Sequence, residues 1–178
     1  MRVTISGPPG SGKTTVARVV AKTLGLDLIL TGQVFREQAK QAKMDVHKYN
    51  NLAEKDRSID EKLDDEIIHL AMKSDNVLVE GRLAGHLFKR RNIPAFRVCV
   101  TAPARIRAER IANREKTTAE REMEKIIKRE LSEKSRYLSF YDIDIEDMSV
   151  YDLVVDSSDI SANDAAGIVA AEIRKMQR

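Results

Sequence analysis

The chain has 178 residues, which suffice for one domain with a sizeable hydrophobic core and exclude two domains of ordinary size. Hydrophobic residues make up 42% and charged residues 33%, which excludes a disordered or fibrous protein, and no apolar run reaches the roughly 18 residues of a membrane span. The 31 basic residues are interleaved with 28 acidic ones and aromatic residues make up 4%, which argues against a nucleic-acid-binding surface. We therefore expect one cytoplasmic domain over residues 1–178 that contacts neither nucleic acid nor a membrane.

Short β-rich runs alternate with helical patterns along the chain. The predicted strands are residues 2–6, 27–30, 76–80, 96–101 and 152–156, with a first helix at 13–24 and a last one at about 162–177. This alternation predicts an α/β fold of three layers, in which helices cover both faces of a parallel five-stranded sheet. Cys99, the only cysteine, lies in the fourth strand and is predicted to be a buried side chain without a chemical role.

The stretch GPPGSGKT at residues 7–14 falls at the predicted turn between the first strand and the first helix. Its glycines let successive amide N–H groups point at one anion, and the helix N-terminus adds its positive end. Lys13 can then reach the β and γ phosphates of a nucleotide, and the Thr14 hydroxyl can bind Mg²⁺. We expect the loop to bind ATP through Gly7, Pro8, Pro9, Gly10, Ser11, Gly12, Lys13, Thr14 and Thr15. A guanine-reading Asn-Lys-x-Asp sequence is absent, which disfavours a GTP-dependent switch.

Polar residues follow the second and third strands at the points where these strands end. Thr31 and Gly32 come after the second strand with Arg36 one turn later, and the third strand ends in Glu80 before Gly81 and Arg82. Because the carboxyl ends of parallel strands open into one ligand crevice, we expect these groups beside the phosphate-binding loop. Glu80 is a candidate to hold Mg²⁺ through a water molecule.

About 45 residues separate the second and third strands, and they are helical by pattern. Apolar residues spaced for one helical face predict that residues 31–75 form a mobile cap over the sheet edge. Asp60 and Asp64 lie one turn apart in this insertion, and we expect them on a solvated face. His47, His69 and His86 lack the spacing of metal ligands and are interpreted as surface or packing residues.

A second helical stretch runs from about residue 103 to 141 and is interrupted near 116–118, where Thr117 or Thr118 can cap the next helix. Arginines recur on its faces at helical spacing, namely Arg110, Arg114, Arg129 and Arg136. Their planar guanidinium groups suit phosphate oxygens.

The number of arginines indicates a second phosphate besides that of ATP. An acceptor phosphate meeting the γ phosphate opposes like charges, each pair at about 4 Å costing about 4 kcal/mol at an effective dielectric constant of about 20. Fixed cations offset this repulsion, and a phosphate oxygen needs no general base, whereas a hydroxyl acceptor usually comes with a positioned carboxylate. Abundant arginine therefore favours a phosphate acceptor.

Taken together, GPPGSGKTT, LTGQVFR, VEGRLAG, ERIANRE and YDLVVDSS resemble the P-loop nucleoside monophosphate kinases, and among them the short archaeal form of the cytidylate kinase family. The resemblance spans essentially the whole chain. It implies a core of residues 1–30, 76–112 and 140–178, a monophosphate-binding insertion at about 31–75, and a short lid at about 113–120 followed by a long helix. It also implies transfer of the γ-phosphoryl group of ATP to CMP or dCMP with Mg²⁺, which gives ADP and CDP or dCDP. We expect the chain to act as a monomer.

The resemblance carries roles over to particular residues. Bacterial relatives hold the monophosphate with Ser-Gly-x-x-Tyr-Arg, which matches Thr31, Gly32 and Arg36, and they carry Gly-Arg-Asp where this chain has Gly81-Arg82-Leu83. Their Arg-Asp-x-x-Asp-x-x-Arg pattern is similar to Arg129-Glu130-x-x-Glu133-x-x-Arg136. In adenylate kinases the equivalents of Arg110 and Arg114 meet adenine and phosphate. The implied catalytic residues are Lys13, Arg82, Arg129 and Arg136, the implied substrate-binding residues are Thr31, Gly32, Arg36, Gly81 and Arg82, and Arg110 and Arg114 join the ATP site.

Two other hypotheses stay open at this point. One is a kinase for another monophosphate, such as AMP or UMP, or for a small hydroxyl-bearing metabolite. The other is an NTP-dependent nucleic-acid-binding or regulatory module, whose ATPase activity a polymer would stimulate.

Overall fold

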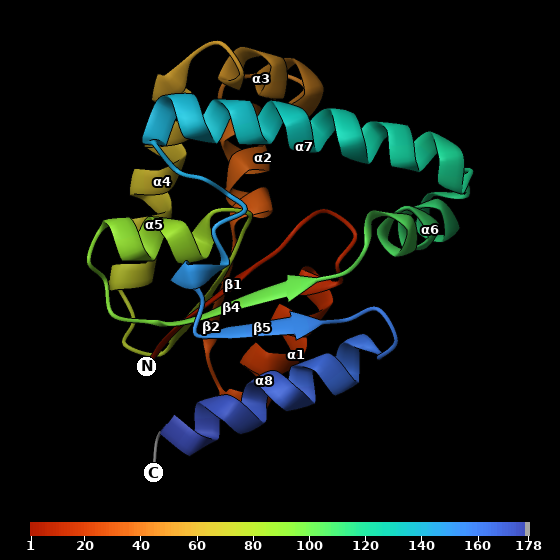
Figure 1. Ribbon diagram of the computed structural model, residues 1–178. Helices are drawn as coiled ribbons and strands as arrows, with labels where there is room; N and C mark the ends of the chain where they lie inside the picture. The colour runs from red at the N-terminus through yellow and green to blue at the C-terminus, as the bar shows by residue number, and fades with distance from the viewer. Residues whose placement is uncertain (177–178) are drawn as a thin grey trace.

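The computed structural model describes residues 1–176, and its centre is one parallel sheet (Figure 1). The five strands follow the order β2-β3-β1-β4-β5, and all four pairings are parallel. The strands are β1 (Arg2–Ser6), β2 (Asp27–Leu30), β3 (Val77–Glu80), β4 (Phe96–Thr101) and β5 (Leu153–Asp156). The predicted five-stranded α/β fold is thus confirmed, and β3 and β5 each begin one residue later than expected.

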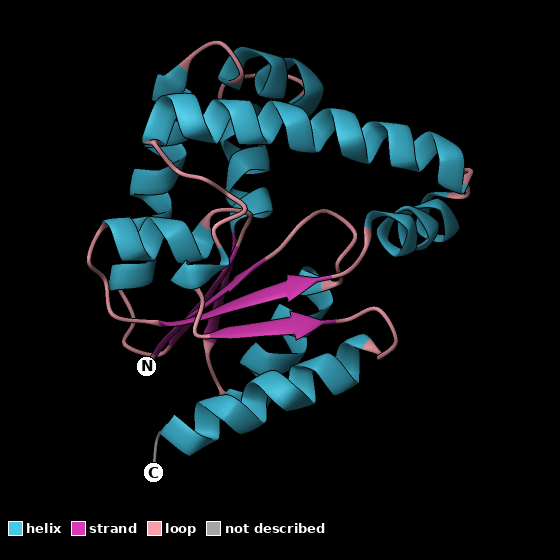
Figure 2. Cartoon of the chain, viewed as in Figure 1, coloured by secondary structure: helices cyan, strands magenta, loops and turns pink. Residues whose placement is uncertain are grey.

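Helices cover both faces of the sheet, which gives the expected three layers (Figure 2). On one face α1 (Lys13–Leu24) and α8 (Ala162–Met176) pack over Val3, Ile5 and Val98. On the other face α4 (Arg57–Met72) and α5 (Ala84–Arg90) pack over Val77 and Val79. Neighbouring strand residues face opposite sides, so buried apolar runs such as Val77–Val79 supply both cores at once. Residue 177, the expected end of the last helix, lies outside the described residues.

Residues 31–75 contain three helices: α2 (Thr31–Gln41), α3 (Val46–Ala53) and the already mentioned α4. The side chains of Asp45 and Asp56 cap α3 and α4 by accepting hydrogen bonds from backbone N–H groups two residues on. Ala39, Tyr49, Ala53 and Ile59 form a small separate core. The insertion therefore has packing of its own in addition to the contact of α4 with the sheet.

The second helical stretch is a hairpin of α6 (Ala104–Glu115) and α7 (Ala119–Tyr141), joined by a three-residue turn. Lys116 adopts a φ of 56° at the end of α6, and Thr118 caps α7 by accepting a hydrogen bond from Arg121 N at 3.3 Å. This confirms the expected interruption and assigns the cap to Thr118. In Figure 1, α7 runs from the α6 side to the helical insertion and so crosses above the edge of the sheet.

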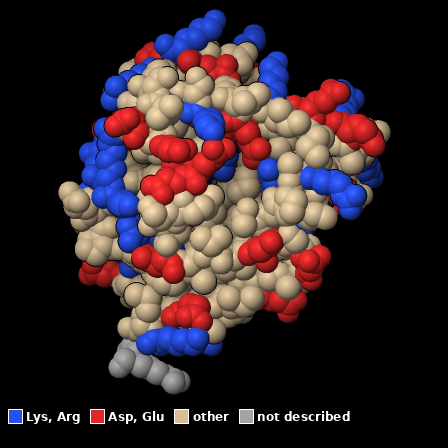
Figure 3. Space-filling view, viewed as in Figure 1, with Lys and Arg blue, Asp and Glu red and all other residues tan. Residues whose placement is uncertain are grey.

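A 3₁₀ turn, η1 (Met148–Val150), leads into β5. Cys99 is buried in β4, as predicted. Figure 3 shows acidic and basic side chains interspersed over the face that it presents, in agreement with the interleaved charges of the sequence. None of the helices among residues 1–176 combines the length and the apolar character that a bilayer crossing requires.

Candidate active site

Two adjoining pockets lie at the carboxyl ends of the strands. The first has a volume of about 1090 Å³ and is lined by the 9–16 loop, α6, α7 and the segment between β5 and α8. The second has a volume of about 340 Å³ and is lined by the ends of β2 and β3 together with α2, α4 and α7. The residues that line both pockets are Lys13, Thr14, Arg36 and Arg129. Three cations and a hydroxyl group therefore stand where the two pockets meet.

The phosphate-binding loop has the strand-to-helix geometry that the sequence predicted. Gly12 directly precedes α1 with a φ of 86°, a conformation that a side chain would strain, and the loop then presents the helix N-terminus to the first pocket. The loop residues that line this pocket are Pro9, Gly10, Ser11, Gly12, Lys13, Thr14 and Thr15. Gly7 and Pro8, also expected in the ATP site, line neither pocket, and the Pro8 carbonyl accepts a hydrogen bond from Lys13 Nζ at 3.4 Å.

Lys13, Thr14 and Glu80 converge at the end of β3. Thr14 Oγ1 donates a hydrogen bond to Glu80 Oε1 at 3.3 Å, and Lys13 Nζ lies 3.8 Å from the same oxygen. Burial lowers the pKa of Lys13, and the neighbouring Arg82 and Arg129 lower it further, while Glu80 acts in the opposite direction. A hydroxyl and a carboxylate beside a phosphate-binding loop are oxygen ligands of the kind Mg²⁺ prefers, so these residues fit the predicted metal position.

The ends of β2 and β3 are pressed together in the second pocket. A Cβ atom on Gly81 would lie 2.3 Å from Thr31 Oγ1, so only glycine allows this close approach. Thr31, Gly32, Gly81 and Arg82 all line the second pocket, as the sequence predicted. Arg36 is exposed in the opening between the pockets, and within residues 1–176 it has neither an ion-pair nor a hydrogen-bond partner.

A single buried carboxylate, Glu133, holds two of the expected arginines. Its Oε2 accepts from Arg82 Nε at 2.6 Å and its Oε1 accepts from Arg129 Nε at 2.7 Å. Burial raises the pKa of Glu133, but Arg82 and Arg129 outweigh this effect and hold the pKa below its usual value. Glu133 thus keeps both guanidinium groups at the pockets, Arg82 in the second and Arg129 at the opening shared by both.

The expectation of a solvated face for Asp60 and Asp64 is wrong. Their residues are only 6% and 9% exposed, because α7 covers this face of α4 with Tyr137, Tyr141 and Arg136. Arg136 Nε lies 3.4 Å from Asp60 Oδ2, and its guanidinium group also lies over the Tyr137 ring. Arg136 lines the second pocket but not the first. Its expected contact with the transferring group therefore stays a prediction.

The buried position of Asp64 predicts a pH-dependent stability. Burial raises its pKa from 3.8 to about 6, the Tyr141 hydroxyl offsets part of this, and Asp60 adds to it. Because the folded chain binds this proton more tightly, stability falls as pH rises from about 4 to above 6, by about 3 kcal/mol at most. Asp64→Asn should therefore unfold at higher urea concentration than the wild type at pH 8 and at the same concentration at pH 4. Asp27→Asn, at an exposed acid of β2 that does not contribute to this pKa shift, should keep the wild-type pH dependence, and a parallel dependence in Asp64→Asn would contradict the assignment.

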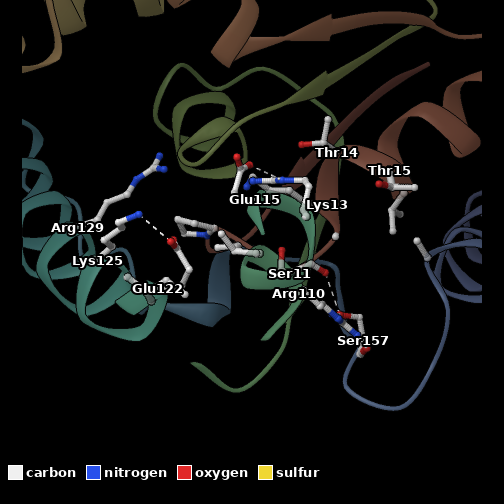
Figure 4. A pocket seen from close by; sticks show the side chains of 18 of the residues that line it. Ser11, Lys13, Thr14, Thr15, Arg110, Glu115, Glu122, Lys125, Arg129 and Ser157 are labelled. Atoms are coloured by element: carbon white, nitrogen blue, oxygen red, sulfur yellow. Dashed lines mark hydrogen bonds and ion pairs between the residues drawn. The ribbon is translucent and has the colours of Figure 1, made fainter. Parts of the chain in front are cut away.

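Arg110 lies at the wall of the first pocket, whereas Arg114 lies at its rim. Arg110 Nη1 donates to Ser157 Oγ at 3.0 Å, so its guanidinium group lies against the segment after β5 at the wall of the pocket (Figure 4). The Arg114 side chain is 71% exposed at the rim and pairs with Glu115. Figure 4 shows Arg129 and Lys125 reaching from α7 on the opposite side.

Sequence reasoning missed two residues that hold the loop. Arg107 is buried, and its guanidinium group donates to Pro9 O at 3.1 Å, to Ala102 O at 2.8 Å and to Glu130 Oε1 at 2.8 Å. Ser157 Oγ donates to Ser11 O at 2.9 Å. The position of Ser157 directly after β5 is a signal that could have found it, whereas nothing in the sequence distinguishes Arg107 from the other arginines of its helix.

The three histidines have no common site. His86 is buried with its ring edge-on to Tyr151 at 5.6 Å, and His69 is exposed, so both are packing or surface residues as expected. His47 is an exposed residue of α3 that also lines the first pocket.

Comparison with known proteins gives a consistent family. A family model described as the cytidylate kinase-like family matches residues 2–159. A cytidylate kinase from Sulfolobus acidocaldarius is 40% identical over 175 residues, covering 98% of this chain and 95% of that protein. A cytidylate kinase from Methanocella arvoryzae is 42% identical, covering 100% of this chain and 99% of that protein.

Solved structures with a similar fold are more distant in sequence. An uncharacterized protein from Eubacterium ventriosum superimposes with a TM-score of 0.74 at 15% identity, covering 98% of each chain. Shikimate kinase from Acinetobacter baumannii, in complex with shikimate, superimposes with a TM-score of 0.61 at 20% identity, covering 98% of this chain and 93% of that one. At these identities the likeness concerns the fold alone.

Proposed function

The chain belongs to the cytidylate kinase-like family, and on this premise we propose that it transfers the γ-phosphoryl group of ATP to CMP or dCMP, giving ADP and CDP or dCDP. One observation carries the proposal beyond family membership. Two pockets of unequal size meet at Lys13, Thr14, Arg36 and Arg129, so two phosphorylated ligands would face each other across three cations. The larger pocket, built on the phosphate-binding loop, suits ATP, and the smaller one suits the monophosphate.

Each charged residue at this junction has a separate task in the proposed reaction. The loop amides and Lys13 hold the β and γ phosphates, Arg36 and Arg82 bind the acceptor phosphate, and Arg129 faces the transferring group. The acceptor oxygen is already anionic, so the cations bring two like charges together and no residue has to remove a proton. Arg110 and Arg114 border the nucleoside part of ATP.

Mg²⁺ is part of the proposal. The Thr14 hydroxyl would hold it, with Glu80 acting through a water molecule, and when bound it neutralises charge between the β and γ phosphates. The insertion of residues 31–75 and the turn near 113–120 would act as cap and lid that exclude water during transfer. The expected monomeric state remains part of the proposal.

A panel of acceptors tests the proposed function. The purified chain would be incubated with ATP and Mg²⁺ plus CMP, dCMP, UMP, AMP or shikimate, and ADP formation would be measured. We expect turnover of CMP or dCMP well above that of the other acceptors. Rapid turnover of shikimate without turnover of any monophosphate would overturn the proposal, and so would ATP hydrolysis that only a nucleic-acid polymer stimulates.

Arg36→Ala should weaken the use of the monophosphate more than the use of ATP. Loss of a hydrogen bond to a charged group costs about 1.5 to 3 kcal/mol, which corresponds to a rise of about 10- to 100-fold in KM for CMP. We expect the KM for ATP to change by less than about 3-fold, because the loop amides and Lys13 remain. Steady-state kinetics with each substrate varied in turn measure both values.

Lys40→Ala provides the matched control for this variant. Lys40 is an exposed cation one turn further along α2 that lines neither pocket, so both KM values should stay at their wild-type level. Equal increases of the two KM values in Arg36→Ala would contradict the role of Arg36 at the acceptor phosphate.

A further inference from the structure

We infer that Glu130 is a positioning residue that fixes the distance between the donor phosphate and the acceptor phosphate. Its carboxylate lies between Arg107, which holds the phosphate-binding loop, and Arg82, which lines the second pocket. The inference rests on the proposed function, because it concerns how the two phosphate groups are aligned for transfer. Glu130 and Arg107 line neither pocket, so both act through the residues that do.

The contact between Glu130 and the phosphate-binding loop runs through Arg107, a residue that is 5% exposed. Arg107 Nη1 donates to Glu130 Oε1 at 2.8 Å and its Nη2 donates to Oε2 at 3.3 Å, so the pair is bidentate. The same Nη1 also donates to Pro9 O at 3.1 Å. A Cβ atom on Gly10 would lie 2.8 Å from Arg107 O, so the backbone of α6 lies directly against the loop. Glu130 therefore ties α7 to the loop that holds the donor.

On its other side Glu130 faces the acceptor pocket. Its Oε1 lies 4.0 Å from Arg82 Nη2, and Glu133, about one turn further along α7, accepts from Nε of the same guanidinium group at 2.6 Å. Burial lowers the pKa of Arg82, but the neighbouring acids Glu133 and Glu130 act in the opposite direction, and the pKa lies above its usual value. One carboxylate thus lies between the guanidinium group at the donor loop and the guanidinium group at the acceptor pocket.

The position of Glu130 within α7 makes this tie relevant to transfer. Arg129, the preceding residue, lines both pockets, and Figure 4 shows its side chain extending from α7. The Arg129 side chain is 62% exposed, so its placement depends on the backbone from which it extends. Glu130 fixes that backbone where α7 passes the junction of the pockets. Because a misplacement of about 1 Å can cost about 100-fold in rate, a tie that sets this alignment should act on kcat.

Glu130→Gln tests the assignment, because glutamine preserves the shape of the side chain and removes its charge. We expect kcat for CMP phosphorylation to fall about 10- to 30-fold. The KM values for ATP and CMP should change by less than about 3-fold, since every residue that lines a pocket is kept. Glu124→Gln, at an exposed acid of the same helix that lines neither pocket, is the matched control and should keep the wild-type kcat.

A ligand that spans both pockets measures the alignment directly. The probe is adenosine joined to cytidine through five phosphates, and calorimetry compares its binding with that of ADP alone and of CMP alone. We expect Glu130→Gln to bind the spanning ligand about 10-fold more weakly than the wild type and each single nucleotide within about 3-fold, because only the spanning ligand depends on the relative position of the two pockets. An equal loss for all three ligands would indicate a general loosening of the fold and would overturn the inference.

Arg107→Lys tests the route from Glu130 to the loop. Lysine keeps the charge but lacks the planar group that contacts Pro9 and Glu130 together. On this background Glu130→Gln should cost less than about 3-fold in kcat, because the tie is already broken. If Glu130→Gln lowers kcat by the same factor with arginine or lysine at position 107, the tie to the loop is excluded and the inference with it.

The outcomes distinguish this inference from the proposed function. A wild-type chain that phosphorylates another monophosphate in place of CMP would overturn the proposed function alone, because the tie concerns the phosphates and not the base. A chain that phosphorylates no monophosphate would overturn both. If Glu130→Gln does not fold, Glu130→Asp still decides, because the shorter acid keeps the charge but not the reach to Arg107 and Arg82. The same weakening for the spanning ligand is then expected, and wild-type affinity would overturn the inference.

Discussion

Replacing Lys13 with methionine is expected to lower kcat for CMP phosphorylation by about 100- to 1000-fold. Lys13 lines both pockets and lies 3.8 Å from Glu80, so its ammonium group is positioned for the phosphoryl group in transit. Removing one fixed electrostatic contact to the charge that develops in a transition state typically costs this much. Methionine keeps the length and the apolar stem of the side chain, so the loss reports on the charge.

The same variant should unfold at an unchanged or higher temperature. Burial lowers the pKa of Lys13, which means that the folded chain bears the charge at a cost in stability. Lys22→Met, at the exposed last turn of the same helix, controls for the loss of a lysine and should leave kcat unchanged. A rise in the KM for ATP with an unchanged kcat would contradict the proposed role of Lys13 in transfer. Stopped-flow or coupled ADP assays and thermal unfolding give the two readouts.

Glu133→Gln is expected to have the second large effect, on stability as well as activity. The change preserves the shape of the side chain but removes the anion that binds Arg82 and Arg129. Breaking a buried ion pair on one side typically costs about 3 to 5 kcal/mol, and because the Arg129 side chain is 62% exposed we expect the lower end, about 3 kcal/mol. Two arginines would also lose their fixed positions, so kcat should fall about 10- to 100-fold.

The pH dependence of this loss provides a check. The pKa of Glu133 lies below its usual value of 4.5, so its contribution to stability is present above that value and is lost as the pH falls through the lowered pKa. The difference in urea midpoint between wild type and Glu133→Gln should therefore be large at pH 7 and shrink in acid. Glu124→Gln, on the exposed side of α7, should behave as wild type at both pH values. A difference that persists undiminished in acid would exclude the ionised carboxylate as its cause.

The elements that local patterns specify were predicted well. The bounds of β1, β2, β4 and α1 match the expected ranges, because β-branched runs and the Gly-Lys-Thr turn act within a few residues of chain. The residues that follow β2 and β3 lie in the second pocket as expected, since parallel strands bring their carboxyl ends to one edge. The notable miss among elements was the environment of α4, whose acidic face was expected in water.

That miss has a plain physical cause. Helical periodicity shows that Asp60 and Asp64 share a face, but it does not show what lies against that face. Here α7, which begins 55 residues after the middle of α4, covers it and buries both acids. The same holds for Glu133, which the sequence offered as one acid among many on a charged helix, and for Arg107, which holds the phosphate-binding loop from α6.

The sequence by itself therefore determined the nucleotide-binding loop, the parallel α/β architecture and the family resemblance, because these depend on contiguous motifs and on the order of short elements. Only the tertiary structure decided which charges are partners, since residues such as Asp60 and Arg136 lie 76 positions apart and meet when α7 crosses the insertion. It also decided that the two pockets share Lys13, Thr14, Arg36 and Arg129. Electrostatic interactions depend on distance and burial in three dimensions, and neither quantity can be read along the chain.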